Sequence, residues 1–285
     1  MSARTTFVIV GGGKMGEAIL SGWLASDATP ADTIEAADIV AVDPTPERRA
    51  YLEESHGIAC VADVADIAAD AKPDVVVLAV KPQVMMGVLE SIAQLPAFQG
   101  AGAADAPLFV SIAAGLTTER IAAALPQDAP LVRVMPNMPL MVGAGASGVC
   151  GGAHATPEQV QYVADLFGCL GRAVVVDESN MDAVCAVSGS GPAYVAALVE
   201  HLRDAGAAQG LDPDLAEVLA LQTVLGTARL IDETSLTPQT AREAVCSPGG
   251  TTLAALDAMN EQGFSQVIDA GVAAAIRRSK ELAAM

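Results

Sequence analysis

The stretch that decides the fold is residues 6–16, which read Thr6-Phe7-Val8-Ile9-Val10-Gly11-Gly12-Gly13-Lys14-Met15-Gly16. Its first half is rich in β-branched and aromatic residues and predicts a short strand. Its second half is a G-x-G-x-x-G pattern, and apolar residues at helical spacing follow it. In such a strand–turn–helix, Gly11 makes the tight turn, Gly13 lets the backbone approach a pyrophosphate, and Gly16 allows close helix–strand packing. We therefore predict a dinucleotide-binding loop.

Short apolar runs separated by helical segments continue the pattern to residue 176. The predicted strands are 6–10, 39–42, 58–61, 75–80, 108–112, 131–135 and 172–176. Strands that alternate with helices predict an α/β fold, here a Rossmann-like doubly wound parallel sheet. Ligands of such sheets bind at the carboxyl ends of the strands. Lys81-Pro82 and the small-residue turn Ala113-Ala114-Gly115 follow two of these runs and are therefore expected at the ligand edge.

The end of the second predicted strand bears on the choice of cofactor. Asp43 stands there, and an acidic residue at this place commonly holds the adenosine ribose hydroxyls, which favours NAD over NADP. Thr45, Arg48 and Arg49 follow, and the arginines are able to accommodate a 2′-phosphate. They also fit a solvated helix face, and the sequence leaves both interpretations open.

After Asp177 every segment has helical period, so we predict two domains, 1–176 for dinucleotide binding and 177–285 as an all-helical domain. Residues 188–192, Ser-Gly-Ser-Gly-Pro, predict a break with a helix beginning near Pro192. The segment 215–230 is apolar on nearly all sides, and a helix of this kind must be buried. A domain of this size offers little cover, so we expect a second subunit to supply it.

Residues 245–252 read Val-Cys-Ser-Pro-Gly-Gly-Thr-Thr and precede a further helical segment. A glycine pair before a helix leaves backbone N–H groups free, and the helix dipole adds positive potential there. Such a place suits a carboxylate or a phosphate. The alternative is an ordinary helix start capped by a threonine. Cys246 fits a small buried hydrophobe better than a nucleophile.

Composition excludes several classes of function. The chain has 285 residues, of which 52% are hydrophobic and 3% aromatic, so it can bury a core of aliphatic residues. Its net charge of −19 argues against nucleic acid as a partner. We expect no membrane-spanning run and no secretory signal. Five scattered cysteines fit reduced thiols in the cytoplasm, and the three isolated histidines lack metal-ligand spacing, so no metal is expected.

Together these residues resemble the pyrroline-5-carboxylate reductase family, over nearly the whole chain. The landmarks are Gly11–Gly16, 79–82, 111–115, 135–139, 188–194 and 247–252, and the last two are the most specific. The resemblance implies an N-terminal Rossmann domain and a C-terminal helical domain that interlocks into a homodimer, with a higher ring of dimers in many members. It also implies hydride transfer from NADPH or NADH to the C=N carbon of a cyclic imino acid, giving proline.

The resemblance also assigns residues. It places a pyrophosphate on Val10, Gly11, Gly12, Gly13, Lys14 and Met15, and the glycine motif adds Gly16 to the cofactor-binding loop. The residue types after the second strand, and not the resemblance, make Asp43, Thr45 and Arg48 the candidates for the adenosine end. The nicotinamide half is assigned to Ala79, Val80, Lys81, Pro82, Ala113, Ala114 and Gly115. The substrate is assigned to Ser247, Gly249, Gly250, Thr251 and Thr252, with Thr252 as the catalytic residue that hydrogen-bonds the ring nitrogen.

Three departures from the family pattern, Pro44, Val64 and Ala244, concern cofactor preference. We expect NADP(H), with NAD(H) as the alternative. A β-hydroxyacid dehydrogenase related to 6-phosphogluconate dehydrogenase would share both domains. It usually needs a lysine early in the helical domain, whereas Lys280 is the only lysine after Lys81. A non-catalytic dinucleotide-binding protein would have no need of residues 247–252.

Overall fold

The structure, a computed structural model, describes residues 5–26, 29–30, 33–100 and 106–283. Contacts divide it into two compact units. The first comprises Met1–Gly189 together with Ala275–Met285, and the second is Ser190–Ala274. The predicted boundary at 176/177 follows the change in residue pattern, whereas packing groups residues 178–189 with the sheet.

One carboxylate explains why the residues after 177 pack with the sheet. Glu178 accepts hydrogen bonds from the backbone N–H of Thr118 (2.7 Å) and from the side chain of Arg133 (3.1 Å), and it also contacts the Thr118 hydroxyl. Arg133 is a buried residue of strand β6. A buried guanidinium needs such a charged partner. The start of the helical region is therefore tied to the sheet.

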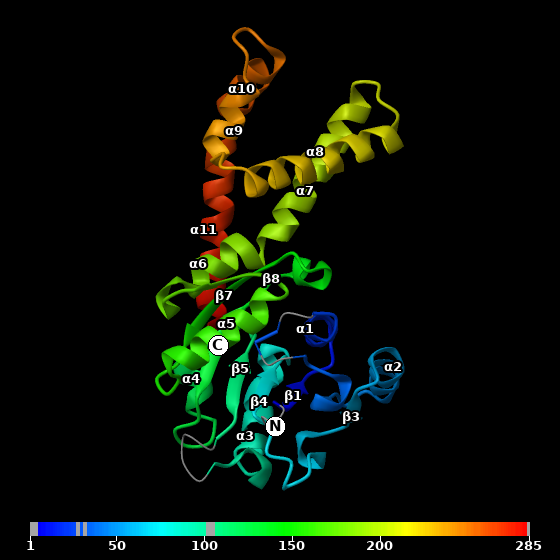
Figure 1. Cartoon of the computed structure of the whole chain (residues 1–285). Coiled ribbons are helices and arrows are strands. Elements are labelled where there is room, and N and C mark those ends of the chain that lie inside the picture. Colours follow the sequence, from blue (N-terminus) through cyan, green and yellow to red (C-terminus); the bar gives the residue numbers. More distant parts are fainter. Residues whose placement is uncertain (1–4, 27–28, 31–32, 101–105, 284–285) are drawn as a thin grey trace. The chain divides into compact units, whose positions relative to one another are not determined.

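The first unit is built on an eight-stranded sheet in the order β3-β2-β1-β4-β5-β6-β7-β8 (Figure 1). The strands are β1 Phe7–Val10, β2 Ile39–Val42, β3 Ala59–Val61, β4 Val75–Leu78, β5 Leu108–Ser111, β6 Leu131–Met135, β7 Gly145–Gly151 and β8 Gly171–Val175. Strands β1 to β6 are parallel to one another. The predicted Rossmann-like class is thus confirmed, with seven predicted strands in place.

Strand β7 is the element that the sequence did not predict, and it pairs antiparallel with β6. Three of its seven residues are glycine, and glycine carries no strand signal. The structure supplies the reason for two of them. A Cβ on Gly148 would lie 2.7 Å from a methyl group of Val184, and one on Gly151 would lie 2.7 Å from a methyl group of Val160. Close packing of helices on this strand therefore requires glycine, and the same glycines prevent the strand from being predicted from the sequence.

The core lies on both faces of the sheet. Along β1, Phe7 and Ile9 belong to one buried cluster, while Val8 and Val10 belong to the other. This alternation follows from the two-residue period of a strand, and burial on both faces explains the unbroken apolar run. Trp23 is fully buried in the first cluster, and its indole N–H donates to the carbonyl of Leu166 (2.9 Å).

Helices connect the strands of the first unit. They are α1 Lys14–Leu24, α2 Pro46–His56, α3 Pro82–Ile92, α4 Thr118–Ala122, α5 Pro157–Gly168 and α6 Met181–Val184, with short 3-10 turns at Ala36–Asp38, Val64–Asp66, Pro96–Phe98, Met138–Val142 and Glu178–Asn180. A π-helical turn, Cys185–Gly189, continues α6. The predicted break at 188–192 is therefore a wide helical turn followed at once by α7, with Pro192 in its first turn.

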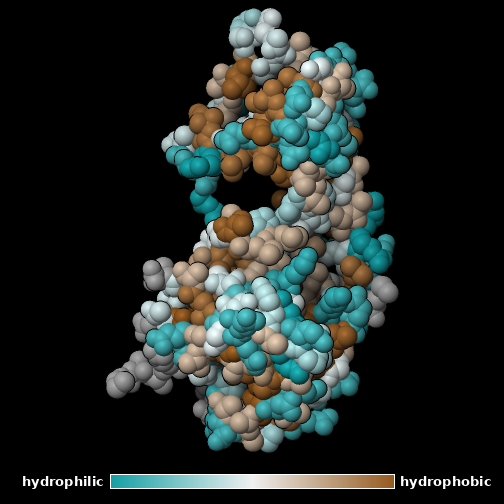
Figure 2. Space-filling model, turned by 90° about the vertical axis from the view of Figure 1, so that its right-hand side faces the viewer, coloured by the Kyte–Doolittle hydropathy of each residue, from teal (hydrophilic) through white to brown (hydrophobic). Residues whose placement is uncertain are grey.

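The second unit is helical. Its elements are α7 Gly191–Ala208, α8 Pro213–Glu233, α9 Pro238–Ala244, α10 Thr251–Glu261 and the first part of α11 Phe264–Ala283. Many large apolar side chains are exposed here, among them Val218 (64%) and Val267 (66%). Figure 2 shows such hydrophobic side chains gathered on the helices at the top of the view.

The end of α11 packs in the first unit. Ser279 is buried, and its hydroxyl donates to the carboxylate of Asp182 (2.6 Å). The guanidinium of Arg120 donates to the carbonyl of Ala283 (3.0 Å). The chain thus leaves the first unit after Gly189 and comes back to it through a continuous helix.

We expected no run of membrane-spanning length, but one helical stretch of the described residues is long and apolar enough to cross a membrane, judged by length and composition alone. The helical stretch Glu178–Ala208 has 31 residues and a mean hydropathy of 1.3 over its most apolar window, of which 6% is buried. Alanine, valine and glycine make it apolar, and the π-helical turn joins its parts into one run.

Candidate functional site

The turn between β1 and α1 is shaped by glycines that touch neighbouring backbone. Gly11 has φ +110°, and a Cβ there would lie 2.8 Å from the carbonyl of Ala79. A Cβ on Gly16 would overlap the carbonyl oxygen of Gly11. Since no larger residue fits at either place, α1 lies directly against the turn. These are the geometric tasks that the sequence assigned to Gly11 and Gly16.

The start of α1 is open. Its N-cap is Gly13, which makes no side-chain capping bond, and a Cβ on Gly13 would meet nothing within 4 Å. The first N–H groups of a helix have no partner within the helix, and the helix dipole makes this end positive. An open helix start of this kind suits an anion such as a pyrophosphate, and it is formed here by Gly13, Lys14 and Met15.

Asp43 lies beside this loop. Its carboxylate accepts a hydrogen bond from the N–H of Gly12 (3.1 Å) and another from the N–H of Thr45 (2.9 Å). The first bond ties the end of β2 to the glycine turn, and the second holds the backbone just after Asp43. A carboxylate has about four acceptor positions, so two remain for ribose hydroxyls. The geometry fits the ribose contact that the sequence predicted for Asp43.

Both arginines bind groups inside the protein. Arg48 donates through Nε to the carbonyl of Gly12 and through a terminal nitrogen to Glu17, and its guanidinium lies 5.0 Å from the ring centre of Tyr51. Arg49 donates to the carbonyl of Asp43 (2.8 Å). The interpretation of these residues as a solvated helix face is therefore wrong.

Sequence reasoning missed Glu17, although its place in the first turn of α1 was visible. Besides Arg48, it contacts His56, with 3.3 Å between Nε2 and the carboxylate. Burial raises the pKa of Glu17, but hydrogen bonds from Arg48, Tyr51 and His56 outweigh this and hold the pKa below its usual value. Glu17 is thus a carboxylate at neutral pH, one helical turn from the N-cap of α1.

The remaining cofactor candidates end neighbouring strands. The N–H of Ala79 donates to the carbonyl of Val10 (2.8 Å), which joins the ends of β4 and β1. Lys81 is the exposed N-cap of α3, and Pro82 is in its first turn. Gly115 has φ +76° and packs against Leu282, because a Cβ there would lie 3.0 Å from that side chain. Val80, Ala113 and Ala114 lie at the same edge of the sheet.

The predicted substrate loop runs into α10 in the second unit. Gly249 has φ +69°, the N–H of Gly250 donates to the carbonyl of Ser247 (2.9 Å), and a Cβ on Gly250 would collide with the Ser247 hydroxyl. The N-cap of α10 is Gly250, with no side-chain capping bond. The alternative of a threonine cap is therefore wrong, because Thr251 and Thr252 lie inside the first turn. The arrangement leaves N–H groups available for a small anion.

Known proteins resemble the chain along its length. A family model described as pyrroline-5-carboxylate reductase dimerisation matches residues 178–282, and one described as NADP oxidoreductase, coenzyme F420-dependent, matches residues 6–115. A pyrroline-5-carboxylate reductase of Synechocystis sp. is 42% identical over 274 residues, which cover 96% of this chain and 97% of that protein. This chain belongs to the pyrroline-5-carboxylate reductase family.

Solved structures of this family agree. The pyrroline-5-carboxylate reductase of Coxiella burnetii has a TM-score of 0.87 at 31% identity, with 98% of this chain and 99% of that one covered. The Plasmodium falciparum pyrroline carboxylate reductase, solved with NADP bound, has a TM-score of 0.82 at 28% identity and 98% coverage of both chains. The fold expected from the resemblance is confirmed.

Two of the family landmarks meet through Asn137. Its side-chain N–H donates to the carbonyl of Ser188 (3.0 Å), and its side-chain oxygen accepts from the N–H of Ala146 (2.8 Å). Gly189 lies against Met135, since a Cβ there would lie 2.5 Å from the methionine methyl group. These motifs thus act as packing determinants of the first unit.

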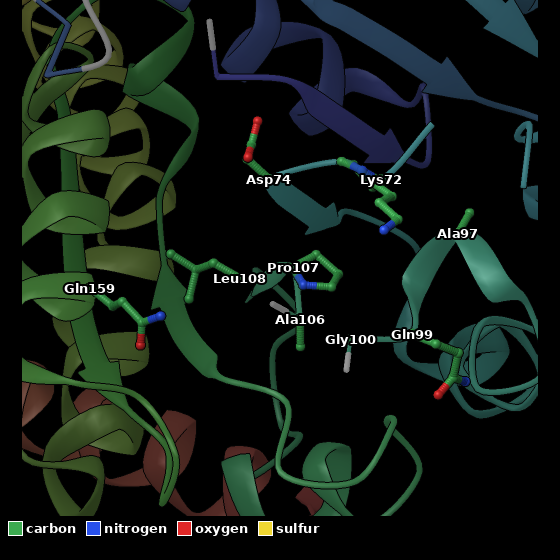
Figure 3. A pocket seen from close by; sticks show the side chains of 10 residues that line it. Lys72, Asp74, Ala97, Gln99, Gly100, Ala106, Pro107, Leu108 and Gln159 are labelled. Carbon is green, nitrogen blue, oxygen red and sulfur yellow. The ribbon is translucent and has the colours of Figure 1, made fainter. Parts of the chain in front are cut away.

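A separate cavity of about 580 Å³ lies at the other edge of the sheet (Figure 3). It is lined by Lys72, Asp74, Gln99, Pro107 and Gln159 among others. Asp74 and Pro107 precede β4 and β5, so the cavity is at the amino ends of these strands, away from the dinucleotide loop. Among the described residues, no group of three or more His, Cys, Asp or Glu side chains is placed to hold a metal ion.

Two glycine substitutions separate packing from ligand approach. Gly16→Ala should lower the free energy of unfolding by about 2 kcal/mol or more, because its Cβ overlaps the Gly11 carbonyl. Gly13→Ala should change stability by less than about 1 kcal/mol, because its Cβ meets open space, yet should weaken dinucleotide binding. Chemical denaturation and calorimetric titration with NADP⁺ and NAD⁺ measure the two effects. Equal loss of stability in both variants would contradict this assignment.

Proposed function

We propose that this chain is a pyrroline-5-carboxylate reductase that reduces the C=N bond of 1-pyrroline-5-carboxylate to L-proline, the last step of proline biosynthesis. Bound NAD(P)H supplies the hydride. The observation that carries the proposal is the glycine-capped start of α10 at Ser247–Thr252, in a chain whose other unit holds a dinucleotide loop. The family membership given above supports the same reaction.

The substrate loop suits the carboxylate of a small imino acid. The N–H groups at the start of α10 and the dipole of this helix hold a negative group without an arginine. Gly249 and Gly250 permit the backbone to turn closely around it, and Ser247 and Thr251 line the same turn. Fixing the carboxylate orients the imine carbon for hydride transfer, and positioning is a large part of the rate gain.

Reduction of the imine needs little general acid or base catalysis. A protonated imine is already an electrophile, so a strong general acid is not required. Thr252, half-buried in the first turn of α10, is assigned the hydrogen bond to the ring nitrogen as it becomes an amine. This hydrogen bond forms as charge leaves the nitrogen, so it acts mainly in the transition state.

We propose NADP(H) as the preferred cofactor, with NAD(H) as the alternative. Thr45 and Arg48 support NADP(H), since both lie beside Asp43 and the glycine loop. The NADP found in the Plasmodium falciparum protein is in line with this. Asp43 supports NAD(H), because its free acceptor positions suit ribose hydroxyls.

The assay that tests the function is oxidation of NADPH and of NADH with pyrroline-5-carboxylate. We expect turnover with both, and a kcat/KM for NADPH higher by roughly tenfold or less, because Arg48 is the one cation proposed to contact the phosphate and it is also paired with Glu17. A β-hydroxyacid run with NAD(P)⁺ is the control for the dehydrogenase alternative. Nucleotide binding with no turnover of the imine would instead support a non-catalytic dinucleotide-binding protein.

Two matched variants, Thr252→Val and Thr252→Ser, test the role of the Thr252 hydroxyl. Thr252→Val keeps the β-branched shape and removes the hydroxyl, so kcat should fall about ten- to a hundredfold, on the order of 1.5–3 kcal/mol. Cofactor affinity should stay nearly the same. Thr252→Ser should keep most of the rate. Thr251→Val should leave kcat nearly unchanged and alter the substrate KM only through the shape of the loop, because the backbone N–H that is assigned to the carboxylate is kept. Unaltered kcat and kcat/KM in Thr252→Val would remove this hydroxyl from the mechanism.

We propose a homodimer through the second unit, in the cytoplasm, with a ring of dimers as a further level of assembly. The apolar side chains exposed on α7, α8, α10 and α11 support a protein partner that covers them (Figure 2). A second copy of this chain accounts for the apolar stretch Glu178–Ala208 without a membrane. Five free cysteines fit a reducing compartment.

Light scattering at micromolar concentration tests the assembly. We expect a mass of at least two chains, because apolar surface of this extent is not stable in water alone. Leu221→Glu, on the exposed face of α8, should dissociate the assembly, whereas Val84→Glu, equally exposed on α3 of the first unit, should leave the mass unchanged. An active monomer of the wild-type chain would overturn this part of the proposal.

A further inference from the structure

The contacts of Arg48 join the two sides of the proposed adenosine site. Its guanidinium binds the carbonyl of Gly12, and the N–H of the same Gly12 binds Asp43. A single residue, Gly12, therefore links Arg48 to the Asp43 carboxylate, which suits the ribose hydroxyls. A phosphate on the ribose 2′-oxygen would reach this guanidinium, as the geometry of arginine and phosphate favours.

In this structure the guanidinium is already occupied by Glu17. The two side chains form an ion pair with exposures of 25% and 22%. Half-burial reduces screening by solvent, so the pair is stronger than one on the open surface. A 2′-phosphate must compete with the Glu17 carboxylate for Arg48, and it also meets the negative charge of Glu17.

Glu17 is held in place independently of Arg48. His56, the last residue of α2, contacts the other carboxylate oxygen at 3.3 Å. The backbone of Glu17 is also fixed, because its N–H donates to the carbonyl of Gly13 (2.9 Å) in the first turn of α1. The Glu17 carboxylate is thus held next to Arg48 by contacts other than the ion pair, and its charge disfavours a further negative group there.

We propose that Glu17 is a specificity-determining residue that limits the preference for NADPH over NADH by holding the guanidinium of Arg48. The proposal rests on the proposed binding of a pyridine dinucleotide at the glycine loop. A cofactor with a free 2′-hydroxyl has no phosphate to bind the Arg48 guanidinium, so the ion pair between Arg48 and Glu17 stays intact. A cofactor with a 2′-phosphate gains Arg48 only by displacing Glu17.

Calorimetric titration with NADP⁺ and NAD⁺ tests this without any substrate. Glu17→Gln removes the charge and keeps the shape, so NADP⁺ should bind about tenfold more tightly while the Kd for NAD⁺ changes by less than about twofold. Glu47→Gln is the matched control, because Glu47 is an exposed acid in the first turn of α2. It should leave the ratio of the two Kd values unchanged.

The double variant Glu17→Gln with Arg48→Gln tests whether Arg48 carries the gain. It should return the affinity for NADP⁺ to the wild-type value or below. An unchanged Kd ratio in Glu17→Gln, an equal gain for both nucleotides, or an equal effect of Glu47→Gln would overturn the proposal.

Two further outcomes keep the result decisive. If Glu17→Gln does not fold by circular dichroism, Glu17→Asp, one methylene shorter, should loosen the same ion pair and shift the ratio toward NADP⁺ by more than twofold. No shift there would also overturn the proposal. Failure of the imine reductase assay leaves these titrations valid, whereas failure of the wild-type chain to bind either nucleotide would overturn the dinucleotide site itself.

Discussion

The close contact between helix α1 and the turn after β1 is the constraint on which the dinucleotide site depends. Gly16 lies against the carbonyl of Gly11, and Gly11 lies against Ala79, just after the neighbouring strand β4. No side chain separates these three backbone segments. The start of α1 is therefore aimed over the carboxyl ends of β1 and β4, with its N–H groups exposed. The other contacts of the site, from Asp43 and Arg48, are made to this turn.

The same local construction occurs a second time, at the start of α10. The start of α10, like that of α1, has a glycine N-cap without a side-chain bond, and a neighbouring glycine with positive φ shapes the turn. In both places backbone N–H groups supply positive potential, and at α1 the first helical residue is the cation Lys14. This suits a chain with a net charge of −19, which can bind anions only through local donors.

Much of the first unit was predictable, because buried parallel strands leave continuous apolar runs and the glycine turn leaves a spaced motif. Strand β7 was not, since the glycines that let Val184 and Val160 approach it also erase its pattern. The position of Glu17 in α1 was readable, but its pairing with Arg48 depends on how α1 and α2 pack, which no local pattern encodes. For the same reason the sequence predicted Arg48 as a candidate for the adenosine end without showing that its guanidinium is paired with Glu17.

The return of α11 gives the chain a particular topology. Residues 190–274 are an insertion within the first unit, because the segment 275–285 is part of that unit. Gly115, at the ligand edge of the sheet, packs against Leu282, and Arg120 holds the carbonyl of Ala283. A fragment that stops at the end of the sheet would therefore be an incomplete nucleotide-binding domain with an unfilled surface. The last turns of α11 thus complete the unit that begins with β1, although the helical insertion separates the two in the sequence.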